Sequence, residues 1–156
     1  MKKILVALDC SVPSMRAARY AAEIASFLPA CHVTLFTVLT GVPHGAKALA
    51  EVVSSETTEL HGDDDHQQEL HEAQNILAEA SALFTECGFG SEQLTTLAKP
   101  LRRGIAQDIL DEAQAHECDT IVVGRRGLSK MQQVVLGSVS RDLIQKGEGI
   151  AVWVID

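Results

Sequence analysis

The chain has 156 residues and a formal net charge of −8, and 46% of its residues are apolar while only 4% are aromatic. This length suits one domain, because two separate cores would each bury too little surface without disulfides or metals. The apolar fraction excludes a disordered chain, and the negative charge argues against a nucleic-acid partner. We therefore expect one globular domain over residues 1–156.

Neither the apolar stretches nor the cysteines indicate a membrane or an oxidising compartment. No stretch reaches the roughly 18 uninterrupted apolar residues of a membrane span. Residues Ile4 to Leu8 are too few for a signal-peptide core, so we expect a cytoplasmic protein without a membrane partner. Because Cys10, Cys31, Cys87 and Cys118 form no CxxC pair, we expect ordinary buried thiols.

Strand and helix patterns alternate from the start of the chain. The aliphatic run Lys3 to Asp9 predicts a strand that is buried on both faces. The segment Ser11 to Ser14 offers capping hydroxyls and a proline suited to the first turn of a helix. Alanines at helical spacing follow, and Pro29 ends this helix. Residues Cys31 to Leu39 predict the second strand.

The second half repeats the alternation. Residues 44–64 predict a loop or a broken helix, and apolar residues at helical spacing predict a helix over 65–86 that Gly88 ends. The later segments, in order, are a strand over 93–98, a helix over 104–116, a strand over 119–124, a helix over 137–146 and a strand over 150–155. This α/β order predicts an open doubly wound, five-stranded parallel sheet with helices on both faces.

Ligands of such sheets bind at the carboxyl ends of the strands, where the strand order reverses. Two predicted strand ends carry polar or glycine chemistry, namely Asp9 and Gly124. The charge pattern agrees, because Thr40 to Ala98 holds one basic residue against eleven acidic ones, while the rest holds twelve basic and ten acidic residues. Several of these basic residues fall near two predicted loops, so an anionic small molecule could bind there.

The most informative motif runs from Gly124 through Gly127 to Gly137 and Ser138, with the spacing G-x2-G-x9-G-S. Glycines directly after a strand let the backbone approach phosphates. A helix that starts at Gly137 adds unpaired amides and hydroxyls. Turn glycines without a ligand are the alternative, but three spacings, a serine and the strand context together favour a phosphate cradle.

This spacing resembles the ATP-binding motif of the universal stress protein family, and the resemblance spans essentially the whole chain. The opening KKILVALDCSVPSMRAARYA also resembles the first strand and helix of that family. The resemblance implies strand order 3-2-1-4-5, which places Asp9 and Gly124 on adjacent central strands. It also implies bound ATP, ADP or AMP, with a Mg or Mn ion bridged by the phosphates, and a homodimer through the C-terminal strand 150–155.

Carried over by position, the resemblance implies a set of nucleotide contacts and no catalytic or metal-ligating residue. The residues expected against adenine and ribose are Ala7, Leu8, Asp9 and Val38. The residues expected along the ribose and phosphates are Val123, Gly124, Arg126, Gly127, Gly137, Ser138, Val139 and Ser140.

The sequence departs from the family pattern in three places. Arg125 and Arg126 stand where a small polar residue and a histidine are frequent; they could strengthen phosphate contacts or obstruct the pocket. The segment Lys99 to Gly104 lacks the usual glycine and short turn, and the strand over 150–155 lacks an initial proline.

Several residues keep a second interpretation. Asp9 could cap the helix that follows it instead of binding ribose. The acidic segment around His66 could hold a metal, although His66 and His71 would not share a helix face and a solvated helix start fits better. Cys10 next to the predicted pocket could be redox-active, although a packed thiol fits better.

The chemistry favours a regulatory ATP-binding protein of the stress response with slow or no hydrolysis. The chain lacks the P-loop pattern G-x4-G-K-S/T and an evident general base. A weak ATPase or adenylate-transferring enzyme of the same fold is one alternative. A nucleotide-free interaction module, in which the arginines close the pocket onto the acids of residues 63–65, is the other.

Overall fold

The computed structural model describes residues 1–41, 63–125 and 136–156. The strands are β1 (Lys2–Leu8), β2 (Cys31–Leu39), β3 (Leu94–Pro100), β4 (Thr120–Gly124) and β5 (Ala151–Ile155). The helices are α1 (Val12–Ala25), α3 (Asp63–Glu86), α4 (Ile105–Ala115) and α5 (Ser138–Lys146), and the short 3-10 helix η1 (Ser91–Gln93) precedes β3. Most of the segment 44–64, predicted as a loop or broken helix, lies outside the described residues.

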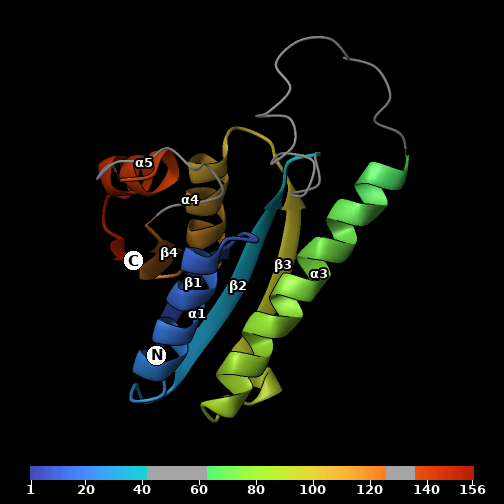
Figure 1. The fold of residues 1–156 in the computed structure, drawn as a ribbon. Helices are drawn as coiled ribbons and strands as arrows, with labels where there is room; N and C mark the ends of the chain where they lie inside the picture. Colours follow the sequence, from blue (N-terminus) through green and yellow to red (C-terminus); the bar gives the residue numbers. More distant parts are fainter. Residues whose placement is uncertain (42–62, 126–135) are drawn as a thin grey trace.

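The five strands form one parallel sheet in the order β3-β2-β1-β4-β5, which confirms the predicted topology. Helices α1 and α3 cover one face of the sheet, and α4 and α5 cover the other (Figure 1). Strand β1 lies between β2 and β4, because Val6 is in register with Leu35 on one side and Val122 on the other. The carboxyl ends of β1 and β4 are therefore neighbours at the point where the strand order reverses.

Alternate residues of each central strand enter two separate cores. In β1, Ile4 and Val6 pack toward α1 and α3, whereas Leu5 packs toward α4 and α5, and all three are at most 1% exposed. Helix α1 contributes five buried alanines to its core, Ala17, Ala18, Ala21, Ala22 and Ala25. Because alanine has no side chain beyond Cβ, these positions let α1 lie close to the sheet.

Several predicted boundaries differ from the structure, and the differences at the end of α1 and the end of β3 have local reasons. The first helix ends at Ala25 and not beside Pro29, because Phe27 N and Leu28 N donate to Ile24 O and Ala25 O in turns. Strand β3 extends to Pro100, two residues past its predicted end, and the Leu101 amide then donates to Leu39 O at 2.7 Å. Proline fits this place because β3 is an outer strand of the sheet formed by the described residues.

None of the helices in the three described ranges is long and apolar enough to cross a membrane.

The cysteines differ sharply in exposure. Cys31 and Cys118 are buried and Cys87 is half-buried, but Cys10 is exposed, so the prediction of a packed thiol is wrong for Cys10. Cys10 follows the end of β1 and precedes the first turn of α1, where the chain crosses the edge of the sheet. Burial raises the pKa of the Cys118 thiol to about 11.

We predict that iodoacetamide modifies Cys10 of the native protein at pH 8 while Cys118 stays unmodified. A thiol whose pKa is about 11 is only about 0.1% thiolate at that pH, and the thiolate is the nucleophile. Peptide mass spectrometry after short exposure measures the ratio. Unfolding in guanidinium is the control and should expose all four thiols, whereas equal rates at Cys10 and Cys118 in the native protein would contradict the described burial.

Candidate functional site

The turn after β1 is held by side-chain hydrogen bonds centred on Asp9. The Asp9 amide leaves the sheet and donates to Ser14 Oγ at 2.9 Å, which ends the strand one residue before its predicted end. The Asp9 carboxylate accepts from the Ser11 amide at 2.9 Å and from the Ser11 hydroxyl. Ser11 is the N-cap of α1 and accepts from the Ser14 amide. Asp9 therefore orients the capping residue and is not itself the cap.

Gly124 ends β4 directly beside the start of α1. A Cβ atom at this position would lie 2.7 Å from the Pro13 carbonyl carbon and 2.9 Å from the Ser14 nitrogen. Backbone atoms cannot yield as the end of a flexible side chain can, so only glycine fits here. The first glycine of the motif thus has a packing role that is independent of any ligand.

Helix α5 begins at the same junction. The Gly137 amide donates to Arg125 O at 3.0 Å, and the Ser140 hydroxyl donates to Gly124 O at 3.0 Å. Ser140 is buried, so its hydroxyl attaches α5 to the end of β4. Gly137 provides no side-chain cap. Within the described residues, the backbone amides of Ser138 and Val139 have no acceptor, as expected for the first turn of a helix.

Apolar residues of three strands line the α4–α5 face near this junction. Val38 of β2 and Val123 of β4 belong to the same buried cluster, and Ala7 packs against it. Leu8 points to the opposite face and packs with α1, so only its backbone can border a ligand on the α4–α5 side. Of the predicted contacts, Arg126 and Gly127 lie outside the described residues.

Arg125 turns toward the end of the chain. Its Nε lies 2.9 Å from Asp156 Oδ1, but the N–H direction does not meet that oxygen, so the contact is an ion pair without a hydrogen bond. The Arg125 amide donates to Ile155 O at 2.6 Å. Arg125 therefore joins β4 to the C-terminal strand.

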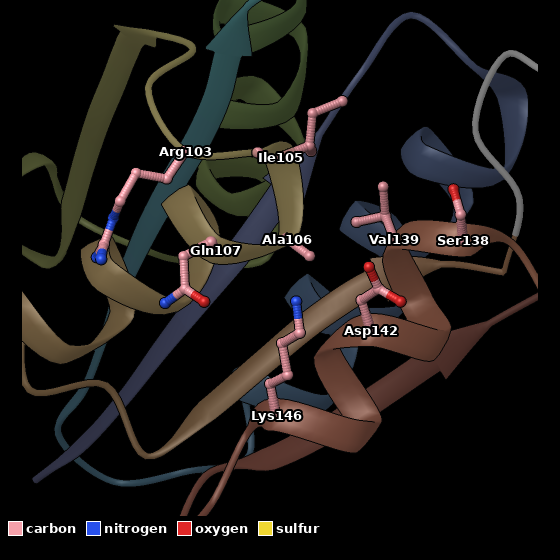
Figure 2. Close-up of a pocket in the computed structure, with 9 residues that line it drawn as sticks. Arg103, Ile105, Ala106, Gln107, Ser138, Val139, Asp142 and Lys146 are labelled. Carbon is pink, nitrogen blue, oxygen red and sulfur yellow. The ribbon is translucent and has the colours of Figure 1, made fainter.

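A groove of about 260 Å³ lies between the start of α4 and one face of α5 (Figure 2). Its lining residues are Arg103, Gly104, Ile105, Ala106, Gln107, Ser138, Val139, Asp142 and Lys146. Ser138 and Val139 belong to the predicted phosphate cradle, so the groove continues from it. The residues from α4 and the later turns of α5 were not predicted, because no motif marks them.

Two buried carboxylates hold the loops around this edge. The Glu69 side chain on α3 is 1% exposed and accepts from the amides of Thr40 and Gly41, directly after β2. Asp108 on α4 accepts from the amides of Arg102 and Arg103, directly after β3. Neither acid was predicted as a functional residue, since both occupy ordinary helical positions and meet their partners only in the fold.

In residues 1–41, 63–125 and 136–156, no three His, Cys, Asp or Glu side chains gather closely enough to hold a metal ion.

A parallel sheet in this order, with helices on both faces, defines an open doubly wound α/β protein. Proteins of this class bind their ligands at the carboxyl ends of the strands. The chain belongs to the universal stress protein family, because the sequence profile of that family matches residues 1–155. A universal stress protein of Mycolicibacterium smegmatis is 28% identical over 155 residues, which are 97% of this chain and 47% of that protein. The chain thus spans about half the length of this curated relative.

Solved structures of universal stress proteins are also similar. One from Archaeoglobus fulgidus is 26% identical with a TM-score of 0.67, over 100% of this chain and 99% of that chain. The structure from Archaeoglobus fulgidus in complex with dAMP is 26% identical with a TM-score of 0.62, over 100% and 98% of the two chains. A universal stress protein in complex with cAMP is 20% identical with a TM-score of 0.67, over 99% and 97%, and this likeness concerns the fold alone.

We predict that Gly124→Ala lowers the free energy of unfolding by about 1–3 kcal/mol, because the added methyl group forces β4 and the α1 backbone apart. Gly137→Ala is the matched control: the φ of Gly137 is −57°, a value that any residue adopts. Its expected cost stays within about 1 kcal/mol. Denaturant unfolding without nucleotide measures both variants, and equal costs would contradict the close approach at Gly124.

Proposed function

We propose that this protein binds an adenine nucleotide, with ATP as the main ligand, at the carboxyl ends of β1 and β4, and that it acts as a regulatory protein of the stress response with slow or no hydrolysis. The observation that carries the proposal is the start of α5 beside the reversal point of the sheet, where the first amides of the helix have no acceptor among the described residues. A helix N-terminus presents N–H groups and positive dipole charge to a phosphate. The dAMP complex of a 26% identical relative supports an adenine nucleotide as the ligand.

The proposed pose uses each predicted contact according to its chemistry. The side chains of Ala7 and Val38 and the backbone of Leu8 would lie against the adenine. Val123 would line the ribose. The Asp9 carboxylate would accept from a ribose hydroxyl while one of its oxygens still holds the Ser11 turn. The amides of Ser138 and Val139 would bind phosphate oxygens.

The remaining predicted contacts complete the pose, in which Gly137 would border the phosphates at the start of α5. Ser140 would act mainly by holding α5 in place, because its hydroxyl already donates to Gly124 O. Gly124 would leave the backbone of β4 close to the ribose, and Arg126 and Gly127 would contribute further phosphate contacts. A Mg or Mn ion would be bridged by the phosphates themselves.

The same set of groups argues for binding without turnover. Asp9 would be engaged by both Ser11 and the ribose, which leaves it poorly placed as a general base. Binding would then act by changing the stability or the surface of the protein, since a ligand that binds only the folded state stabilises it. Release of ADP or a transferred adenylate at a steady rate, abolished by a change at Asp9, would favour the weak-enzyme alternative.

We predict that Asp9→Asn weakens AMP and ATP binding about tenfold or more, because a hydrogen bond to a charged acceptor is replaced by one to a neutral amide. The asparagine side chain keeps an oxygen that can accept from Ser11, so the turn after β1 should keep its structure. Asp119→Asn is the matched control, since Asp119 lies at the amino end of β4 and contacts Lys2 and Lys3. Isothermal titration calorimetry measures the affinities of both variants and the parent.

The parent must first be tested for nucleotide carried from expression, by denaturing it and identifying what is released by mass spectrometry. Absence of both released nucleotide and binding of added AMP, ADP and ATP would refute the proposed function. The nucleotide-free interaction module would then take its place.

We further propose that two copies pair through β5. This strand is an outer strand of the sheet formed by the described residues, and its side chains from Val152 to Ile155 are only half-buried. Ala151 N donates to Asp119 O and Ile155 O accepts from Arg125 N, so these residues bond toward β4. Because orientation alternates along a strand, the amides of Val152 and Val154 face outward. An apolar edge with outward amides is suited to pairing with a second strand.

We predict that Val154→Pro converts a dimer into a monomer, because proline removes an outward N–H while the hydrogen bonds to β4 remain. Trp153→Pro is the contrasting variant, which removes an inward bond and should lower the thermal stability. Analytical ultracentrifugation gives the masses. A Val154→Pro protein that remains dimeric would exclude pairing through this edge.

A further inference from the structure

The groove between α4 and α5 is too small to hold a complete nucleotide. Its volume of about 260 Å³ is below the roughly 300–1,000 Å³ of complete small-molecule sites. It is nevertheless several times larger than the volume of about 30 Å³ that one water molecule occupies in the liquid. Because Ser138 and Val139 also line it, the groove begins where the proposed phosphate cradle ends. Its size and position fit the end of a ligand that is anchored elsewhere.

Two opposite charges on α5 face this groove. Asp142 and Lys146 are four residues apart, so they share one face of the helix, and Figure 2 shows both side chains directed into the space beside α4. Within the described residues Lys146 has no ion pair, and Asp142 lies 3.8 Å from Arg141 Nε. The Arg103 guanidinium is paired with Asp111 and points away from the groove in Figure 2. Of the described residues that line the groove, Lys146 is therefore the cation that is available to a ligand.

The position of Lys146 suits the end of a phosphate chain. Its Cα lies roughly 12 Å along the helix axis from Ser138, at 1.5 Å per residue. Side chains of a helix lean toward its N-terminus, so the long lysine side chain brings its ammonium back toward Ser138. A phosphate chain that starts at the first amides of α5 and follows the groove therefore runs toward this ammonium.

We infer that the groove receives the terminal phosphates of the bound nucleotide, and that Lys146 and Asp142 set the preference for ATP over AMP. The inference rests on the proposed nucleotide site. Lys146 attracts the additional negative charge of a triphosphate, and Asp142 repels it. A divalent ion on the phosphates reduces their net negative charge and so weakens the repulsion by Asp142. Asp142 therefore disfavours the bare triphosphate more than the metal-bound one.

The test compares AMP, ADP and ATP on the full chain by isothermal titration calorimetry, first at low salt without divalent ions. Lys146→Gln should weaken ATP binding about threefold to tenfold and leave AMP within about twofold. Asp142→Asn should strengthen ATP binding about twofold to fivefold and again leave AMP unchanged. Lys2→Gln is the matched control, because it removes the same charge from a residue that lies outside the groove and pairs with Asp119.

The opposite signs of the two effects separate an electrostatic role from a structural one. A variant that only disturbs α5 would weaken AMP and ATP equally. If AMP binds and neither variant changes the ratio of ATP affinity to AMP affinity relative to Lys2→Gln, the inference is overturned while the proposed function stands. If the parent binds none of the three nucleotides, both are overturned. Addition of Mg²⁺ should reduce the gain from Asp142→Asn, and an undiminished gain would refute the role of Asp142.

Discussion

The close contact between the end of β4 and the first turn of α1 is the constraint on which this edge of the protein depends. Gly124 permits it because a Cβ atom there would overlap the Pro13 carbonyl. At the same strand end, Gly124 O and Arg125 O accept hydrogen bonds from the Ser140 hydroxyl and the Gly137 amide. The Arg125 amide donates to Ile155 O. One strand end thus positions α1, α5 and β5 together. Any shift at Gly124 would be passed to each of them, because packed backbones have little room to adjust.

Buried carboxylates extend this rigidity to the outer strands. Glu69 and Asp108 each accept from two successive backbone amides after β2 and β3, and Glu112 accepts from Lys99 and His116. A buried acidic side chain is tolerated inside a protein only when its oxygens are well hydrogen-bonded, as they are in these three residues. They keep backbone amides of the loops occupied. The first turn of α5 has no side-chain cap, and neither has the first turn of α4, in contrast to the loop amides after β2 and β3.

This contrast connects the fold with the proposed regulation. A site whose surroundings are held by hydrogen bonds but whose helix start is open is prepared for an anion without rearrangement, and preorganisation lowers the cost of binding. The groove beyond it carries one cation and one anion on the same helix face. In such an arrangement the number of phosphates and the presence of a metal ion would alter the affinity for the nucleotide. The protein would then respond to the phosphorylation state of the adenine nucleotide.

The sequence by itself determined the alternation of five strands with helices, the parallel sheet and its family, because aliphatic periodicity and glycine spacing are local signals. It also placed Asp9, Gly124 and Ser138 at the edge where they lie. Only the tertiary structure decided what these residues touch: Gly124 packs on Pro13, Ser140 bonds to β4, Leu8 faces away from Val38, and Cys10 is exposed. The packing of α4 against α5, which creates the groove, could not be predicted from the sequence either. Such contacts join residues far apart in the chain, and their partners are set by packing and not by spacing.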